Sequence, residues 1–266
     1  MDLDLDGARA IVLAGSSGLG RASATELVRA GARVVVTSSD PNNLTAAVDD
    51  ITQETGCDPD RVSYAVCDLS DPDSIENGLG EALDTLGGLD VLVTNHGGTT
   101  TKPFSEASLV DFDRAYETVL RSTIHACMLT QQALREGDGG AIVNLVSASA
   151  LEPPATTALS NVIRPGIFGL SKTLANELGE DGVRVNCVCP RGVYTDRIDY
   201  KIDQLAEREG ISIEEATQIR EEELPLSRLG TTEEFGRVVA CLASPAAGFI
   251  TGAVVPADGG WLRGAF

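Results

Sequence analysis

Short apolar runs alternate with longer stretches of helical pattern along nearly the whole chain. Each run is four to six residues long and rich in Val, Ile or Ala, which is typical of strands buried on both faces. The pattern predicts seven strands, at Ala10–Ala14, Arg33–Thr37, Val62–Val66, Val91–Thr94, Ala141–Val146, Val183–Val188 and Ala253–Ala257.

The order of these elements predicts the fold class. Strands that alternate with helices require right-handed crossovers, which give a mainly parallel sheet with helices on both faces. Local signals agree, because Gly31 follows a helix ending near Ala30, and Asp40 and Pro41 suit the N-cap and first position of the next helix. No linker or repeat divides the chain, so residues 1–266 are predicted to form one doubly wound α/β domain.

One segment breaks the alternation. Residues from Asp196 to about Arg228 are charged, rich in Glu and helical in pattern, and they precede a further helix near Thr232–Ala243. We expect this 196–228 segment to form a helical cap over a substrate site at the strand ends. The alternative is a solvated surface helix.

Composition narrows the class of partner. The formal net charge is −20, which disfavours nucleic acid, and no apolar run is long enough to span a bilayer. The N-terminal residues Met1–Asp6 are acidic and lack the basic start of a signal peptide, so a cytoplasmic location is expected. Only three lysines occur (Lys102, Lys172 and Lys201), and this acidic, halophile-like composition suggests a high-salt cytoplasm.

The cysteines and histidines do not indicate a metal site. None of the six cysteines forms a Cys-x-x-Cys pair, and the chain has two histidines, His96 and His125. Cys187 and Cys189 alternate along the sixth expected strand and should share one face of it. We therefore predict no metal, and we interpret most cysteines as small buried apolar residues.

A glycine-rich segment follows the first expected strand. Residues 13–20 read Leu-Ala-Gly-Ser-Ser-Gly-Leu-Gly and lead directly into a helix. Gly15, Gly18 and Gly20 allow a tight turn and close approach of a pyrophosphate to backbone N–H groups at the helix start. Between a plain turn and a nucleotide site, this placement favours a Rossmann-type dinucleotide site.

This segment and several others resemble the short-chain dehydrogenase/reductase family, over about residues 7–262. The family has Thr-Gly-x-x-x-Gly-x-Gly here, and this chain has Leu13 and Ala14 in place of the Thr and the first Gly. Arg191 replaces a Gly in the segment that closes on the nicotinamide. Further matches occur in family order at Cys67–Leu69, Thr94–Gly97, Asn186–Thr195 and Thr251–Gly260.

The resemblance implies an NAD(P) cofactor. Ser38 and Ser39 end the second strand without an acidic residue, and with Arg21 near the glycines they favour NADP over NAD. Asp40 is more simply the N-cap of the next helix. The expected cofactor-binding residues are Gly15, Ser16, Ser17, Gly18, Leu19, Gly20, Ser38, Ser39, Asp68, Leu69, Asn95, His96, Gly97, Pro190, Val193 and Thr195.

The catalytic pattern of the family is only partly present. Ser147 matches the Ser that polarises the carbonyl oxygen, but Ser160 stands at the Tyr position and Arg164 at the Lys position. Val119 fills the position of the Asn that anchors a water relay. Serine is shorter and far less acidic than tyrosine, and arginine stays charged, so the usual proton relay is lost.

Three interpretations remain open. The first is an active oxidoreductase acting on a ketone or secondary alcohol, whose proton comes from Ser147, Tyr194, His96, or water held by Ser160 and Arg164. The expected catalytic residues are Ser147, Ser160, Arg164 and Tyr194. The second is an inactive nucleotide-binding sensor or accessory subunit, and the third is a structural subunit. Pro165 suggests a kink that aims Arg164 at the cofactor or else repacks an oligomer interface.

The resemblance also implies partners. It suggests a small-molecule substrate and a homodimer or homotetramer packed through helices around residues 108–135 and 156–179. Within the family, the 3-oxoacyl-acyl-carrier-protein reductase branch is nearest in layout, so a 3-oxoacyl-type substrate is one expectation.

Overall fold

The computed structural model describes residues 3–137 and 139–264. A seven-stranded, all-parallel sheet forms its centre, in the order β3-β2-β1-β4-β5-β6-β7. The predicted α/β class and strand number are therefore confirmed. The strands are β1 (Arg9–Val12), β2 (Arg33–Ser38), β3 (Val62–Val66), β4 (Val91–Thr94), β5 (Gly140–Leu145), β6 (Val183–Pro190) and β7 (Val254–Ala257).

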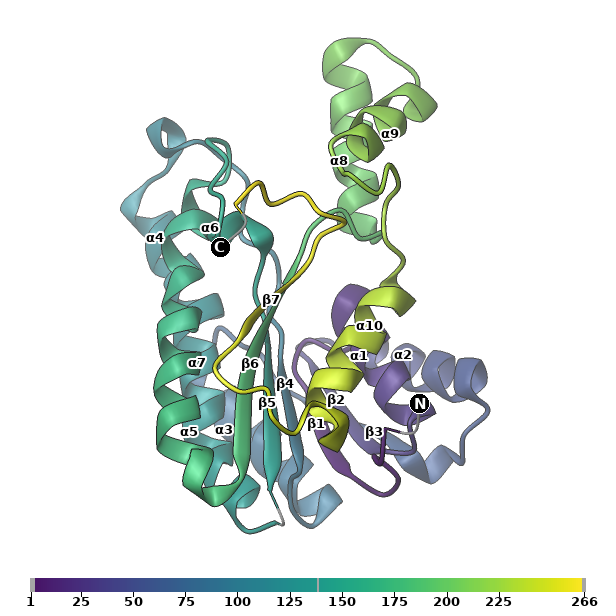
Figure 1. Ribbon diagram of the computed structural model, residues 1–266, viewed down its shortest axis with the longest axis vertical. Coiled ribbons are helices and arrows are strands. Elements are labelled where there is room, and N and C mark those ends of the chain that lie inside the picture. The colour runs from purple at the N-terminus through teal and green to yellow at the C-terminus, as the bar shows by residue number, and fades with distance from the viewer. Residues whose placement is uncertain (1–2, 138, 265–266) are drawn as a thin grey trace.

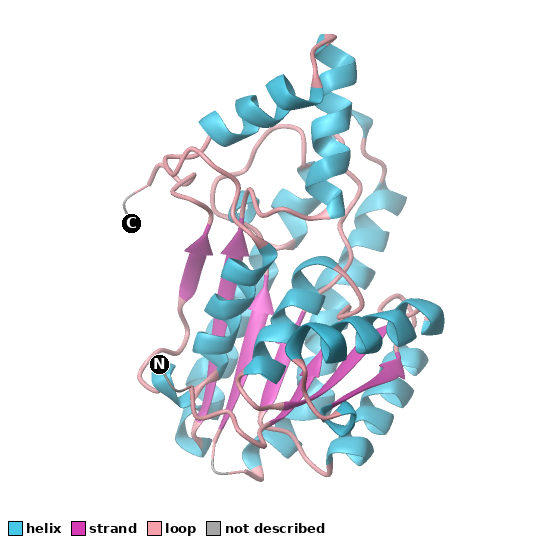
Figure 2. Ribbon diagram, turned by 90° about the vertical axis from the view of Figure 1, so that its right-hand side faces the viewer, coloured by secondary structure: helices cyan, strands magenta, loops and turns pink. Residues whose placement is uncertain are grey.

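Helices cover both faces of the sheet (Figures 1 and 2). One face carries α1 (Gly18–Arg29), α2 (Pro41–Thr55) and α10 (Thr232–Ala243). The other carries α3 (Pro72–Leu86), α5 (Ser122–Arg135) and α7 (Pro165–Leu178). The remaining helices are α4 (Leu109–Ala115), a π-helical turn (Tyr116–Arg121), α6 (Ala158–Ile163), α8 (Asp196–Glu209) and α9 (Ile213–Glu222). Within the described residues, no helix is long and apolar enough to cross a membrane.

The sheet separates two apolar layers. Ala10 and Val12 of β1 join the layer under α1 and α10, whereas Ile11 and Leu13 join the layer under α3 and α5. Successive side chains of a strand point to opposite faces, so residues 10–12 of β1 are all apolar because both faces of the sheet are covered there, and only Arg9, at the start of the strand, is charged. Full burial of a side chain such as Ile11 contributes roughly 1.5–3 kcal/mol.

The strand order creates the ligand-binding edge. From β1 the chain proceeds outward to β2 and β3, then returns to β4 on the other side of β1. In such sheets the crossovers on either side of this point leave opposite faces, so a crevice opens at the carboxyl ends of the strands. The glycine segment after β1, His96 after β4 and Ser147 after β5 all lie at that edge.

Element boundaries differ from the predicted ones by one or two residues, with physical reasons. β1 ends at Val12 because Ala14 has φ +45°, which no strand accommodates. Asp40 is the N-cap of α2 as predicted, and its carboxylate accepts a hydrogen bond from the Asn42 N–H at 2.8 Å. β6 extends to Pro190, where the chain pairs with Ala257 of β7.

Residues 196–228 form a helical projection beyond the strand ends (Figure 1). Helices α8 and α9 pack on each other through a small apolar cluster of their own. Trp261, from the C-terminal tail, packs against this cluster and ties the tail to it. The buried members of the cluster are Ile202, Leu205, Ala206, Ala216, Leu224 and Leu229.

Candidate active site

The glycine segment forms a cradle at the start of α1. The N–H of Gly15 donates to the Thr37 carbonyl at 2.8 Å, which fixes the turn against β2. Gly18 has φ +53°, and a Cβ at Gly20 would overlap the Ala14 carbonyl oxygen. Ser17 caps α1 without a side-chain capping bond, and the first turn contains no acidic residue. The free N–H groups and the positive end of the helix dipole therefore suit a pyrophosphate.

Asn95, the residue that follows β4, shapes this cradle. Its side-chain amide donates to the Ala14 carbonyl at 3.1 Å, and the Leu13 N–H donates to the Val93 carbonyl at 3.0 Å. Ala14 stands in left-handed backbone conformation, which costs an L-residue roughly 1–2 kcal/mol. The amide of Asn95 thus holds the strained residue that replaces the family's glycine.

The expected ribose end lies after β2. Within the described residues, no hydrogen bond occupies the hydroxyl of Ser38 or Ser39. Arg21 is already engaged, because its guanidinium contacts Asp50 and lies 3.6 Å from Glu54 on α2. Of the three groups that favoured NADP in the sequence, only the two hydroxyls are free to contact a 2′-phosphate.

The expected adenine end follows β3. The Asp68 carboxylate accepts hydrogen bonds from the N–H and hydroxyl of Ser70, at 2.9 and 2.7 Å. The Asp68 N–H donates to the Ser74 hydroxyl at 2.9 Å. These contacts hold the Asp68–Leu69 loop beside the end of β2, where the Cys67 N–H donates to the Ser38 carbonyl at 2.9 Å.

A chain of three hydroxyls connects two of the predicted catalytic residues. Ser147 follows β5 as the N-cap of a 3₁₀ turn, and its Oγ lies 2.8 Å from the Oγ of Ser149. The Oγ of Ser149 lies 3.2 Å from the Oγ of Ser160 on α6. Sequence reasoning missed Ser149, whose only signal was its position two residues after Ser147.

Arg164 contributes a buried cation at the same edge. It joins α6 to α7 and keeps helical backbone (φ −65°, ψ −33°), contrary to the preference expected before Pro165, which begins α7. Its guanidinium donates to the Val146 carbonyl, and its Nε has no hydrogen-bond partner among the described residues. Burial lowers the pKa of Arg164 to about 10, so the side chain stays charged at neutral pH.

His96 is a neutral partner of Arg164. Its Nε2 lies 3.4 Å from Nη1 of Arg164, and its Nδ1 lies 3.3 Å from the Gly97 carbonyl. Burial, followed by the Arg164 charge, lowers the pKa of His96 to about 3. The contacts assign a neutral ring whose Nδ1–H donates to Gly97 and whose Nε2 accepts from Arg164. A neutral imidazole in this position is a poor proton donor.

Two other positions stand apart from this cluster. Tyr194 is 43% exposed, and within the described residues its hydroxyl makes no hydrogen bond to the serines, His96 or Arg164. Val119 lies in the π-helical turn and packs with Val146, Ile167 and the pair Cys187 and Cys189, which share a face as expected. The position of the family's relay Asn is thus apolar.

The segment after β6 crosses the cradle. A methyl carbon of Thr195 lies 3.8 Å from the position that a Cβ would take at Gly18. Val193 pairs with Gly230, and the Tyr194 N–H donates to the Gly230 carbonyl at 2.8 Å. The segment is therefore anchored to the chain that leads into α10 and passes close to the cradle.

Arg191 fastens the start of this segment to the projection. Its guanidinium stacks over the Trp261 ring, 4.2 Å from the ring centre, and lies 3.3 Å from the Glu223 carboxylate. A glycine at this position, as in the family pattern, has no side chain to make either contact.

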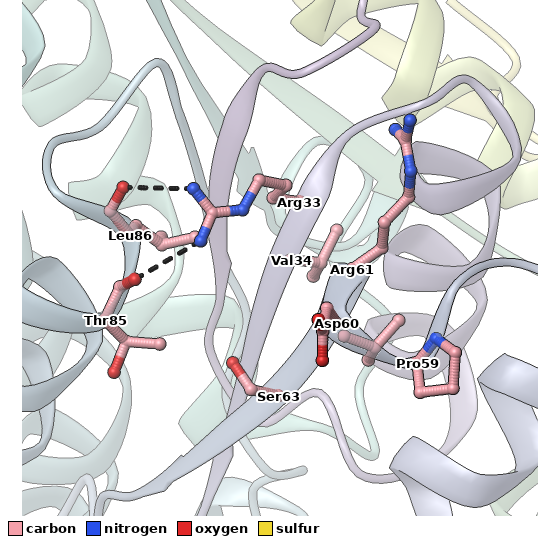
Figure 3. Close-up of a pocket in the computed structure, with 9 residues that line it drawn as sticks. Arg33, Val34, Pro59, Asp60, Arg61, Ser63, Thr85 and Leu86 are labelled. Atoms are coloured by element: carbon pink, nitrogen blue, oxygen red, sulfur yellow. Dashed lines mark hydrogen bonds between the residues drawn. The ribbon is translucent and has the colours of Figure 1, made fainter.

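Two hollows lie outside the cluster of hydroxyls. One, of about 460 Å³, is lined by Val193, Pro225 and Phe235 among others, beside α10. The other, of about 350 Å³, lies at the amino ends of β2 and β3, the opposite edge of the sheet (Figure 3). There Arg33 already donates to the carbonyls of Thr85 and Leu86 at 3.4 and 3.5 Å. The second hollow is remote from every predicted site residue.

Comparison with known proteins agrees with this architecture. A family model described as enoyl-(acyl carrier protein) reductase matches residues 13–262. The chain is 30% identical over 263 residues to the 3-oxoacyl-acyl-carrier-protein reductase of Aquifex aeolicus, covering 98% of this chain and 99% of the relative.

Solved structures extend the comparison. L-sorbose reductase of Gluconobacter frateurii, solved with NADPH and L-sorbose, superimposes with a TM-score of 0.93 at 26% identity, covering 99% of this chain and 100% of that one. A short-chain oxidoreductase of Pseudomonas aeruginosa PAO1, described as containing an atypical catalytic center, gives 0.89 at 29% identity over the full length of both chains. A short-chain oxidoreductase of the same organism and description has been solved with NADPH bound. This chain therefore belongs to the short-chain dehydrogenase/reductase family of NAD(P)-dependent oxidoreductases.

Proposed function

We propose that the protein is an NADPH-dependent oxidoreductase that transfers a hydride between the cofactor and a ketone or secondary alcohol, with Ser160 and Arg164 in place of Tyr and Lys. The observation that carries this proposal is the hydroxyl chain. It runs from Ser147 through Ser149 to Ser160, with oxygen separations of 2.8 and 3.2 Å, and Ser160 stands one helical turn before the buried cation of Arg164.

The cradle fits a dinucleotide. Gly97 has no atom within 4 Å of a hypothetical Cβ, and Gly18 has only Thr195, so both leave room for a ligand against the backbone. Gly15–Gly20 would hold the pyrophosphate, Ser38 and Ser39 the 2′-phosphate, and Asp68 with Leu69 the adenine. His96 and the segment from Pro190 through Val193 to Thr195 would border the nicotinamide. When bound, the cofactor supplies or accepts the hydride.

The hydroxyl chain provides the proton path. As the substrate carbonyl carbon accepts hydride, negative charge develops on the carbonyl oxygen. Ser147 donates its proton to that oxygen, Ser149 reprotonates Ser147, and Ser160 reprotonates Ser149. Water in contact with Ser160 restores the last proton, and oxidation of an alcohol runs the same steps in reverse.

Arg164 acts as a fixed charge. Its guanidinium cannot relay a proton at neutral pH, but a buried cation beside the hydroxyl chain stabilises the alkoxide character that develops during transfer. His96, neutral and 3.4 Å away, holds the guanidinium in place. The NADPH complexes of the sorbose reductase and the Pseudomonas oxidoreductase support the choice of NADPH.

Three further features belong to the proposal. The α8–α9 projection caps the substrate, and the chain assembles as a homodimer or homotetramer through the helices around residues 108–135 and 156–179. Because the relatives include a 3-oxoacyl-acyl-carrier-protein reductase, 3-oxoacyl compounds belong in the first substrate panel.

The test begins with the cofactor. Purified protein in molar KCl is titrated with NADPH and NADH, followed by nicotinamide fluorescence, and is then assayed with a panel of ketones. Micromolar NADPH binding with turnover that Ser160→Ala abolishes supports the proposal. NADPH binding without turnover on any ketone or alcohol favours the inactive sensor, and absence of binding overturns both.

A further inference from the structure

Three positively charged side chains lie at the carboxyl ends of the strands: Arg164, Arg197 and Lys201. Within residues 3–137 and 139–264, none of the three has an acidic group within ion-pair distance. The chain holds 40 acidic and 20 basic residues, so most basic side chains are expected to have an acidic partner. Most other arginines do find acidic partners, as Arg191 and Arg220 both do at Glu223.

Arg197 reaches from the cap to the loop that carries His96. Its guanidinium packs against the backbone of Gly98, where a Cβ would overlap it, and donates to the Thr99 carbonyl at 3.2 Å. Thr195, two residues earlier, has a methyl carbon 3.8 Å from the position that a Cβ would take at Gly18 of the cradle. The arginine is thus held beside the proposed nicotinamide end, and the residue as a whole is exposed.

Lys201 stands one helical turn after Arg197, on the same face of α8. Like charges four residues apart on a helix repel each other. The Lys201 side chain is half-buried, and burial, followed by the charges of Arg197, Arg191, Arg220 and Arg164, lowers its pKa to about 8. All of the charges that shift this pKa are cationic.

The third cation, Arg164, interacts electrostatically with both Arg197 and Lys201. Arg164 is 7% exposed, and its Nε has no hydrogen-bond partner among the described residues. A buried donor and a repelling pair of cations both raise the free energy of the unliganded protein. Binding of an anion between α8 and the strand ends relieves this cost.

We propose that the substrate carries a carboxylate, which Arg197 and Lys201 bind while its ketone or alcohol group lies at Ser147. This assignment rests on the proposed function and names its substrate class: oxo or hydroxy acids rather than neutral ketones. Arg197 and Lys201, on the α8–α9 projection, bind the carboxylate end of the substrate. The hydroxyl chain acts on its ketone or alcohol end.

The test measures binding, so it does not depend on turnover. Trp261 is the only tryptophan of the chain and packs against the cap, so its fluorescence reports on this region. The NADP⁺-loaded protein is titrated with 4-oxopentanoate, methyl 4-oxopentanoate and inorganic phosphate. We expect the carboxylate to bind at least about tenfold more tightly than its ester, because hydrogen bonds to a charged acceptor are stronger than those to a neutral one.

Variants identify the residues. Lys201→Met and Arg197→Met should each reduce the carboxylate-over-ester preference to near one while the NADPH affinity stays unchanged. Arg208→Met is the matched control, because Arg208 lies on the same helix, is highly exposed and pairs with Glu209, and it should keep the preference. Thermal melting checks that each variant remains folded.

Four outcomes would overturn the proposal. They are equal binding of carboxylate and ester, a preference that survives both variants, tighter binding of phosphate than of carboxylate, and loss of NADPH affinity in Lys201→Met. The last would assign these cations to the cofactor phosphates. Failure of the hydride-transfer function is distinguishable, because it leaves carboxylate-selective binding intact in a protein that turns nothing over.

Discussion

Nη1 of Arg164 lies 3.4 Å from Nε2 of His96, so the position of the family's lysine is occupied by a cation held by a neutral imidazole. The two residues are 68 positions apart, on the loop after β4 and between α6 and α7. Among the described residues no carboxylate lies within ion-pair distance of this guanidinium. Its burial therefore lowers the stability of the fold, while its charge remains available to the reacting oxygen.

Arg164→Met should therefore separate the two properties. Removing a desolvated charge without a counter-ion is expected to raise the free energy of unfolding by about 1 kcal/mol. Losing the fixed charge at the developing alkoxide should lower kcat by about 10²-fold. Denaturant unfolding and steady-state kinetics on the same preparation measure both. A variant that is less stable would show that the bond to the Val146 carbonyl outweighs the desolvation of the cation.

Ser149 is expected to be needed for proton transfer. Ser149→Ala removes the hydroxyl that joins those of Ser147 and Ser160 and should lower kcat by roughly 10–100-fold, with unchanged NADPH affinity. Ser149→Thr retains a hydroxyl and should recover much of the rate. If the alanine variant keeps full kcat, Ser147 receives its proton from another source.

His96 should affect acid stability without shaping the activity profile. Its folded pKa, about 3, lies below the ordinary value near 6.5, so above pH 6.5 the ring is neutral in both folded and unfolded states. Below pH 6.5 the unfolded state binds the proton first, so stability falls by up to about 1.4 kcal/mol per pH unit.

The measurement is the free energy of unfolding at pH 7 and pH 5 for the parent and for His96→Gln. We expect the parent to lose about 2 kcal/mol more than the variant over this range. His125→Gln, on α5, is the control and should behave as the parent does. The pH dependence of kcat should keep its shape in His96→Gln, and a lost acidic limb would instead make His96 a proton donor.

The sequence was sufficient to predict the positions of the strands, because each strand is marked by the pattern of a few consecutive residues. Apolar runs bounded by glycine or polar residues placed all seven strands within two residues of their observed ends. The cradle was equally local, since its glycines lie within eight consecutive residues between a strand and a helix. The exception is Ala14, where a residue of strand-like character takes a left-handed turn that the fold imposes.

Contacts between distant segments could not be predicted in this way. Ser149 joins the hydroxyl chain only because a 3₁₀ turn and α6 bring three side chains together. Arg197 meets Thr99 across 98 residues of sequence. The neutrality of His96 depends on its burial and on the Arg164 charge, neither of which a list of residue types contains. The positions of the strands therefore followed from the sequence, whereas the electrostatics of the site depend on contacts that only the folded chain makes.

The acidic surface should make stability depend on salt. With a net charge of −20, self-repulsion opposes the compact state, and the screening length falls from about 10 Å at 0.1 M to about 3 Å at 1 M salt. The free energy of unfolding is expected to rise steadily from 0.1 to 2 M KCl. A flat response would contradict the halophile-like interpretation of the composition.

Ala14→Gly should stabilise the protein. Alanine at φ +45° costs roughly 1–2 kcal/mol, and the greater freedom of glycine in the unfolded chain returns about 0.4–1 kcal/mol of this, so a net gain of about 0.5–1 kcal/mol is expected. The Asn95 bond to the residue-14 carbonyl involves only backbone at that position and should persist. Urea unfolding measures the gain. The control is Ala30→Gly at the C-cap of α1, where φ is −81°, and it should not be stabilised. A loss of stability in Ala14→Gly would mean that packing of the alanine methyl outweighs the backbone strain.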